Sequence, residues 1–199
     1  MVEKKYINAQ ELLEDSFQLG LNILNSGFRP NFIVGIWRGG TPVGIAVQEL
    51  LDYYDVKTDH IAIRTSAYEG INQRSKQIRV HGLDYIVGNV NAEDGLLIVD
   101  DVYDSGLSVK AVLDALRERA RKNTPHDIRI ATVYYKPTND ETNRPPDYFL
   151  YETDKWLIFP HELTGLTREE IFENKPIAKK IIEGVEAYEN NKRVHKKDT

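Results

Sequence analysis

The chain has 199 residues, which suits one compact domain and leaves no room for two large independent ones. Hydrophobic residues make up 41% and charged residues 29%, a balance too apolar for a wholly disordered protein. The lack of cysteine excludes disulfides, thiolate metal sites and a cysteine nucleophile, and the net charge of -5 argues against general nucleic-acid binding. No apolar run approaches the roughly 20 residues that cross a bilayer. Residues 1–10 also lack the apolar stretch of a secretory signal, so we expect a cytoplasmic protein that binds neither nucleic acid nor membrane.

Helical and strand patterns alternate along the first half of the chain. Leu12, Leu13, Phe17, Leu21 and Leu24 recur at helical spacing and predict an amphipathic helix. The predicted elements are, in order, a helix over 9–26, a strand over 32–36, a helix over 43–53 with Thr41 as its N-cap and Pro42 at its first position, a strand over 60–63, a polar loop over 65–76, and short antiparallel strands over 77–80 and 85–87 around a turn at His81–Gly82. Long polar loops of this kind often act as lids.

The second half continues the alternation. Its predicted elements are a continuous apolar strand over 96–99, a helix over 109–120, strands over 128–135, 148–151 and 156–159, a helix over 167–172 that opens with a capping box, a last helix over 177–188, and a polar tail over 189–199 that frays. This order predicts one α/β domain over residues 1–199, built on a mostly parallel sheet flanked by helices, with its core at about 31–162.

The candidate ligand-binding residues cluster where the apolar strand over 96–99 ends. Asp100 and Asp101 follow it directly, and two adjacent carboxylates need solvent, hydroxyl donors or a metal ion, because burying each charge costs several kcal/mol. Residues 104–108 then offer hydroxyls, a glycine and backbone N–H groups where a helix begins, an arrangement that holds a phosphate. Alone, the acidic pair could be a solvated strand end and Ser105–Gly106 an ordinary turn. Together they predict a site for a polyhydroxylated sugar phosphate.

The segment Leu96–Ser108 resembles the signature of the type I phosphoribosyltransferases: an apolar strand, two acidic residues and a phosphate loop. The resemblance implies that Asp100 and Asp101 meet the ribose hydroxyls, directly or through Mg²⁺. It also implies that Asp104 lies near the purine N7 as a proton acceptor. The residues implied to hold the 5-phosphate of phosphoribosyl pyrophosphate are Asp104, Ser105, Gly106, Leu107 and Ser108.

Upstream, Val34–Gly40 resembles the pyrophosphate loop of the same family, in which a strand ends in a basic residue and two glycines. Arg38 can donate forked hydrogen bonds to an anion, and Gly39 and Gly40 let the backbone approach it closely. The alternative is a tight turn between a strand and a helix. Family members often carry a non-proline cis peptide here, so we predict one between Trp37 and Arg38.

Two further segments resemble the 6-oxopurine branch of the family, which takes hypoxanthine, guanine or xanthine. Lys136, followed by a proline, can donate to a carbonyl at position 6 of the base. Trp156 resembles the aromatic residue that stacks on the purine, and the Leu157 carbonyl would meet position 2. Glu162 is a candidate metal ligand, although His161 stands where the family pattern has tryptophan. Lys136 could instead be a solvated strand-end lysine, and Trp156 a core aromatic.

In the polar loop, Ser66 and Tyr68 resemble the serine and tyrosine of a hood that closes over the reaction, except that Ala67 separates them. Basic residues near this loop that could help to hold pyrophosphate are Arg64, Arg74, Lys76 and Arg79, and the alternative for most of them is an exposed, charge-rich loop. Closure would exclude water, which would hydrolyse the activated sugar.

The resemblance covers about residues 31–162 and implies a Mg²⁺-dependent enzyme that forms dimers or tetramers. This enzyme transfers ribose 5-phosphate from phosphoribosyl pyrophosphate to a 6-oxopurine in purine salvage. Three alternatives stay open: a regulatory protein that senses phosphoribosyl pyrophosphate on the same fold, an orotate or uracil enzyme, and, ranked last, a receiver domain. Only Lys136 and Trp156 argue for a purine. A related glutamine amidotransferase is excluded because it needs a cysteine.

Overall fold

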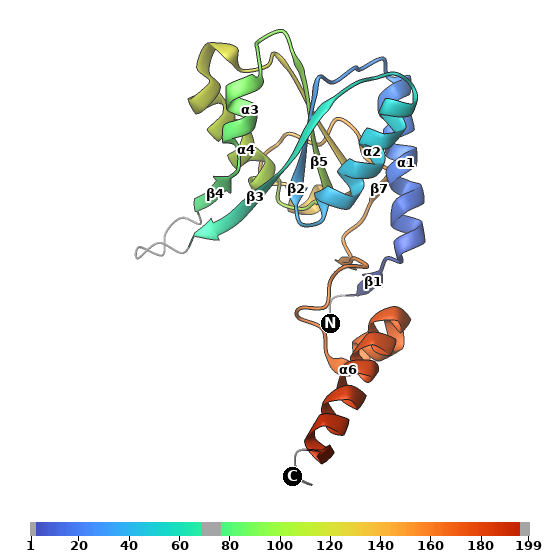
Figure 1. The fold of residues 1–199 in the computed structure, drawn as a ribbon. Coiled ribbons are helices and arrows are strands. Elements are labelled where there is room, and N and C mark those ends of the chain that lie inside the picture. Colours follow the sequence, from blue (N-terminus) through green and yellow to red (C-terminus); the bar gives the residue numbers. More distant parts are fainter. Residues whose placement is uncertain (1–2, 69–76, 196–199) are drawn as a thin grey trace. The chain divides into compact units, whose positions relative to one another are not determined.

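The computed structural model describes residues 3–68 and 77–195, and the chain divides into two compact units. Residues 9–155 form the larger unit, whereas residues 1–8 and 156–199 form the smaller one. In the larger unit, α1 and α2 cover one face of a six-stranded sheet and α3 and α4 cover the other (Figure 1). The predicted α/β fold with helices on both faces of its sheet is confirmed.

The larger unit has the strand order β4-β3-β2-β5-β6-β7, and all neighbours are parallel except β3 and β4. Its elements are α1 (Ala9–Asn25), β2 (Phe32–Trp37), α2 (Gly40–Tyr53), β3 (Asp59–Tyr68), β4 (Gln77–His81), α3 (Asp84–Asn89), β5 (Gly95–Tyr103), α4 (Leu107–Ala120), η1 (Arg121–Asn123), β6 (Asp127–Tyr135), η2 (Pro137–Asn139) and β7 (Tyr151–Glu152). The smaller unit holds β1 (Lys4–Tyr6), β8 (Trp156–Ile158), α5 (Arg168–Asn174) and α6 (Pro176–His195), and β1 pairs with β8 in parallel.

The sheet centre is apolar on both faces, as a parallel strand between two helical layers requires. Residues 96–99 of β5 are at most 1% exposed. Side chains of β2, β5 and β6 pack with α3 and α4 in one hydrophobic cluster that includes Val34, Ile98 and Ile130. This packing fixes the ends of β2, β5 and β6, because the strands run in register at Val34↔Ile98 and Ile98↔Ile130.

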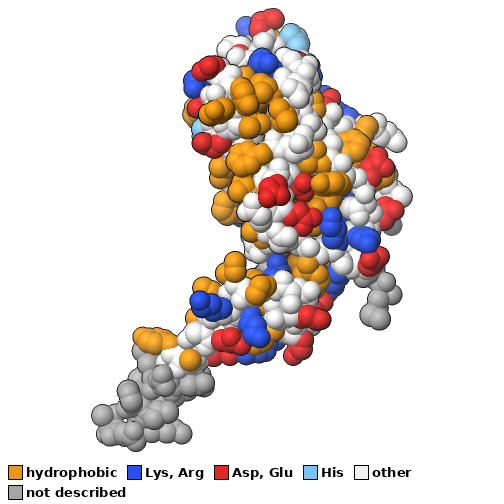
Figure 2. All heavy atoms as spheres, turned by 90° about the vertical axis from the view of Figure 1, so that its right-hand side faces the viewer, with side chains coloured by type: hydrophobic (Ala, Val, Ile, Leu, Met, Phe, Trp, Pro, Cys, Tyr) orange, Lys and Arg blue, Asp and Glu red, His pale blue; other side chains and the backbone are white. Residues whose placement is uncertain are grey.

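Helix α1 packs through a different face from the one that the sequence predicted. Gly20 lies against α2, where a Cβ atom would come within 2.9 Å of Leu50 Cδ2. The buried face of α1 combines the small residues Ser16 and Gly20 with larger ones, and its members are Leu12, Asp15, Ser16, Leu19, Gly20 and Ile23. Three members of the predicted stripe, Leu13, Phe17 and Leu21, are exposed. Figure 2 views the molecule from the α1 side, where apolar side chains lie among charged ones.

The strand predicted over 85–87 is wrong, because those residues belong to α3. Leu83, Ile86 and Val90 are all at most 2% exposed, and their spacing of three and four residues is that of a helix. The predicted strand over 77–80 is confirmed as β4. It pairs antiparallel with β3, which continues to Tyr68 through the first part of the predicted loop. The remainder of that loop, residues 69–76, lies outside the described residues.

Several element ends also differ from expectation. Helix α2 begins at Gly40 with Gly39 as its N-cap, so Thr41 lies inside the helix and is not the cap. Tyr148 makes only an isolated bridge to Ala131 before the two-residue strand β7. The capping box at Thr167 is confirmed, and α6 continues to His195 through most of the predicted tail. In the described part of the chain, no helix is both long and apolar enough to cross a membrane.

Candidate active site

The ends of β2 and β5 bring the glycine turn and the acidic pair together. These strands are neighbours in the sheet, with Gly35 opposite Val99, so the residues that follow them meet at one edge. A Cβ atom at Gly39 would overlap the Asp101 carboxylate, and one at Gly40 would lie 2.8 Å from Asp100 Cα. Glycine is therefore required at both positions, because the acidic pair occupies the space where a side chain would be.

The acidic pair is electrostatically strained. Burial raises the pKa of Asp100 well above its usual range, and the neighbouring charge of Asp101 raises it further. The backbone N–H groups of Asp101, at 3.0 Å, and of Gly40 donate hydrogen bonds to the Asp100 carboxylate, and these bonds lower its pKa. Asp101 is itself only 8% exposed. A cation that contacts this pair would relieve both the repulsion and the lost hydration.

Carboxylate oxygens are the donors that Mg²⁺ prefers, so the pair fits this ion chemically. Among the described residues, no cluster of three or more His, Asp or Glu side chains could hold a metal by itself. A Mg²⁺ ion at Asp100 and Asp101 would consequently take its other oxygens from a ligand or from water. This pattern is typical of Mg²⁺ sites that also bind phosphates.

The turn after β5 has the shape of an anion-binding loop. Gly106 has a φ of 74° and precedes the first residue of α4, so its backbone lies in the left-handed region that favours glycine. A Cβ atom there would also lie 2.6 Å from ring atoms of Tyr103. Ser105 Oγ accepts a weak hydrogen bond from the Leu107 N–H at 3.4 Å. The first N–H groups of α4 follow this turn, as the sequence predicted.

Asp104 and Lys136 form an ion pair that joins the ends of β5 and β6. Lys136 is 6% exposed, and its Nζ donates to Asp104 Oδ2 at 3.0 Å. The side-chain amide of Asn139, in η2, donates to Asp104 Oδ1 at 2.7 Å. The sequence analysis missed Asn139. The sequence held no signal for it, because the register that places Tyr103 opposite Tyr135 is known only from the sheet.

The peptide between Trp37 and Arg38 is cis, as predicted, and the Arg38 side chain is exposed. Ser66 lies on β3, where its Oγ is 3.1 Å from His81 Nε2 on β4. Tyr68 ends β3, opposite Gln77. Arg64 and Arg79 lie on the same two strands, opposite His81 and Ser66 respectively. Arg74 and Lys76 lie outside the described residues.

The other predicted contacts with the base are in the smaller unit. Trp156 is 56% exposed, and its backbone N–H donates to the Glu3 carbonyl at 2.9 Å. Its neighbour Leu157 is buried on β8. Glu162 Oε2 accepts the Phe159 N–H at 3.0 Å, so this carboxylate closes its own turn. Buried Lys175 donates to the Phe159 carbonyl at 2.7 Å, and burial lowers its pKa.

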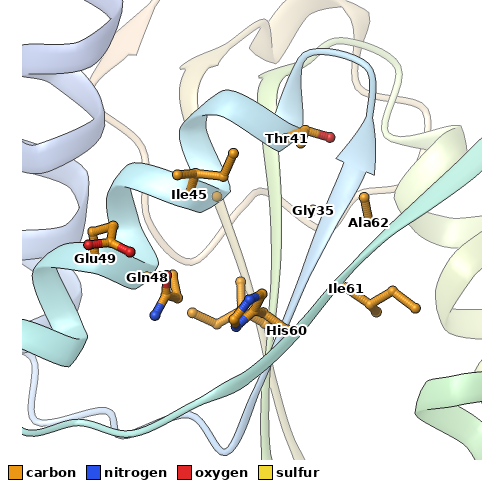
Figure 3. A pocket seen from close by; sticks show the side chains of 10 residues that line it. Gly35, Thr41, Ile45, Gln48, Glu49, His60, Ile61 and Ala62 are labelled. Atoms are coloured by element: carbon orange, nitrogen blue, oxygen red, sulfur yellow. The ribbon is translucent and has the colours of Figure 1, made fainter.

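A cavity of about 400 Å³ lies between α2 and the adjoining strands, apart from the acidic pair (Figure 3). Thr41, Ile45, Gln48 and Glu49 line it from α2, and His60, Ile61 and Ala62 line it from β3. Thr41 Oγ1 is buried there without a hydrogen-bond partner. The sequence analysis did not single out this cavity.

Comparisons with known proteins identify the family of the chain. Residues 5–164 match the phosphoribosyl transferase domain model. A hypoxanthine-guanine phosphoribosyltransferase from Lactococcus lactis is 27% identical over 180 residues, which cover 88% of each chain. The fold resembles a purine phosphoribosyltransferase from Pyrococcus horikoshii, with a TM-score of 0.64, 22% identity and coverage of 83% of this chain and 98% of that one. It also resembles a hypothetical protein from Neisseria gonorrhoeae with bound ppGpp, with a TM-score of 0.69, 19% identity and coverage of 90% and 97%. Because the domain model spans most of the sequence, the chain belongs to the phosphoribosyl transferase domain family.

Proposed function

We propose that this protein transfers the ribose 5-phosphate group of phosphoribosyl pyrophosphate to a 6-oxopurine base and releases pyrophosphate. The pair of Asp104 and Lys136 carries the proposal, because its two groups have opposite hydrogen-bonding roles and lie 3.0 Å apart. A 6-oxopurine presents N7 and O6 side by side on one edge. Asp104 accepts the proton of N7, and Lys136 donates to O6.

Adenine fits this pair poorly, since its amino group would place a donor against the ammonium of Lys136. An ammonium has three N–H donors, so Lys136 can hold Asp104 and the base at once. The Asp104 carboxylate likewise has about four acceptor sites, of which Lys136 and Asn139 use two. About two acceptor sites therefore remain, and the N7 proton needs one of them.

In the reaction, the bond between the anomeric carbon and pyrophosphate breaks while a bond to the purine nitrogen forms. Positive charge develops on the sugar, and Asp100 and Asp101 favour that transition state over the substrate. Arg38, with Gly39 and Gly40, holds the pyrophosphate, and the turn at residues 105–108 holds the 5-phosphate. Asp100 and Asp101 would hold a Mg²⁺ ion, which would supply positive charge against the leaving group.

The remaining roles come from the resemblance. Trp156 stacks on the base, the Leu157 carbonyl meets position 2, and Ser66 and Tyr68 help to cover the site. A metal-binding role for Glu162 stays a prediction, as do assembly into a dimer or tetramer and residence in the cytoplasm. The names of the Lactococcus and Pyrococcus relatives support a purine as acceptor.

The test is pyrophosphate release with phosphoribosyl pyrophosphate, Mg²⁺ and one base at a time: hypoxanthine, guanine, xanthine, adenine, orotate and uracil. We expect turnover with at least one 6-oxopurine and little with adenine. Turnover with orotate or uracil alone would overturn the choice of base. Tight binding of phosphoribosyl pyrophosphate without turnover of any base would instead favour the regulatory alternative.

A pair of matched variants tests the proton acceptor. Asp104→Asn should lower kcat by about 10² to 10⁴, the usual contribution of general acid-base catalysis. Asp114→Asn is the control, because Asp114 lies on the exposed side of α4 and pairs with Lys110. Unfolding curves should be similar for both variants. If Asp104→Asn had the same kcat as Asp114→Asn, Asp104 would have no part in proton transfer.

A further inference from the structure

Asp104 is held from two sides by one short segment of chain. Lys136 bonds to one carboxylate oxygen at 3.0 Å, and the Asn139 side chain bonds to the other at 2.7 Å. The Asp104 side chain is 48% exposed, whereas that of Lys136 is 7% exposed. Burial among its neighbours therefore restricts Lys136 much more than Asp104. Two donors on different oxygens fix the plane of a carboxylate, which one donor cannot do.

The segment that carries Asn139 is itself tied to the end of β5 by backbone hydrogen bonds. The Lys136 N–H donates to the Tyr103 carbonyl at 2.9 Å, and the Asn139 N–H donates to the Lys136 carbonyl at 3.1 Å. Two residues later, the Glu141 N–H donates to the Ser105 carbonyl at 3.1 Å. The turn that contains Asn139 is thus bonded to residues on both sides of Asp104.

Side chains reinforce the same connection. The Tyr103 hydroxyl lies 2.9 Å from Thr142 Oγ1 and donates to the Arg144 carbonyl at 2.8 Å. Thr142 in turn donates to Asp140 Oδ1 at 2.7 Å. The Tyr103 ring is also the group that fills the space beside Gly106. Residues 140–144 consequently support the turn after β5 through contacts that do not involve Asn139.

The geometry points to Asn139 as a positioning residue that holds the Asp104 carboxylate in the orientation needed to accept the proton of the base. This inference rests on the proposed function, since it assigns to Asn139 a task in the same proton transfer. Asn139 touches Asp104 and acts through it. Because the brace formed by residues 140–144 is separate, loss of the Asn139 amide should leave the turn folded and leave Asp104 free to rotate.

The experiment measures kcat and KM, with hypoxanthine or guanine as acceptor, for Asn139→Ala and Asn139→Asp. Both should lower kcat about tenfold and change the KM for phosphoribosyl pyrophosphate less than twofold, because a hydrogen bond to the ionised acceptor is lost. Asn139→Asp keeps the shape of the side chain, removes its N–H donors and adds a negative charge beside Asp104, whereas Asn139→Ala removes the donors without adding charge. If Asn139→Ala retained full kcat, the donor would be unnecessary and the inference would fail.

Thr138→Val is the matched control. The Thr138 hydroxyl donates to Asp154, so this change removes a hydrogen bond from the same turn without touching Asp104. The kcat of Thr138→Val should stay within twofold of the wild type. If Thr138→Val and Asn139→Ala lowered kcat equally, the cause would be a general disturbance of the turn. Thermal unfolding of each variant checks that the chain is folded.

A double-mutant cycle separates positioning from a structural role. Once Asp104→Ala has removed the carboxylate, adding Asn139→Ala should lower kcat no further. Additive losses would overturn the inference. A wild-type protein that turns over no base would remove the proposed function and this inference with it. An active wild type with unaffected Asn139 variants would remove the inference alone.

Discussion

Gly39 offers the sharpest test of how the active site is packed. In Gly39→Ala, the three atoms nearest the new Cβ all belong to the Asp101 carboxylate, and the farthest of them lies at 2.6 Å. Ordinary van der Waals contact begins at 3.4 Å, so even this atom must retreat by about 0.8 Å. Asp101 is only 8% exposed and has little space into which it can move. The substitution should therefore displace one of the two proposed catalytic carboxylates.

Two magnitudes follow from this displacement. Overpacking of a buried position typically costs 1–3 kcal/mol, so the free energy of unfolding should fall by about 2 kcal/mol. Misplacement of a catalytic group by about 1 Å can cost a factor of about 10² in rate, so kcat should fall by about that factor. Denaturant unfolding gives the first quantity, and pyrophosphate release gives the second.

Gly44→Ala is the control, because the same substitution at that position of α2 meets no atom closer than 3.8 Å. Alanine inside a helix is favoured over glycine by about 0.5–1 kcal/mol, so this variant should be more stable than the wild type and should keep its activity. If the two variants behaved alike in stability and turnover, the proposed contact between Gly39 and Asp101 would be wrong.

Three further predictions follow from the structure. Burial raises the pKa of Asp100, so the folded state holds this proton more tightly than the unfolded state, and this carboxyl lowers stability as pH rises above the usual Asp range. Asp100→Asn should therefore abolish turnover but raise the urea midpoint at pH 7, with the gain shrinking toward pH 4. If the urea midpoint rose less at pH 7 than at pH 4, the raised pKa of Asp100 would be contradicted. Lys136→Met should lower kcat/KM for hypoxanthine about ten- to hundredfold. The ratio of kcat/KM for hypoxanthine to that for adenine should fall as well, and competition between the two bases would measure this ratio. Gly184→Ala should stabilise α6 by about 0.5–1 kcal/mol, since an added Cβ has no atom within 4 Å, and a fall in melting temperature would reveal an unrecognised contact.

The sequence predicted the elements whose pattern was local and strong. The apolar run of β5 and the polar turn after it identified the fold and most of the candidate site, because a strand buried on both faces has few alternatives. The paired carboxylates and glycines could also be expected to meet, since each set follows a strand of the same parallel sheet. That β2 and β5 are neighbours, although β3 and β4 lie between them in the sequence, is known only from the strand order of the sheet.

What the sequence could not predict depended on contacts between distant segments. The predicted stripe of α1 included Leu13, Phe17 and Leu21, whereas the close approach of α2 at Gly20 buried the face that contains Gly20. Residues 83–90 were too short for period two and helical spacing to be told apart until the burial of Leu83 and Ile86 was known. The hydrogen bond from Asn139 to Asp104 joins residues 35 positions apart and leaves no local pattern.

The pairing of β1 with β8 has a practical consequence for experiments on the termini. Lys4 lies opposite Trp156, and the Glu3 carbonyl accepts the Trp156 N–H, so the opening residues of the chain provide the neighbouring strand for the tryptophan proposed to stack on the base. Removing residues 1–6, or fusing a bulky affinity tag directly to them, should weaken affinity for the nucleobase more than affinity for the sugar phosphate. Purification handles are therefore better attached through a long spacer, and assays of acceptor preference should be repeated with the handle cleaved.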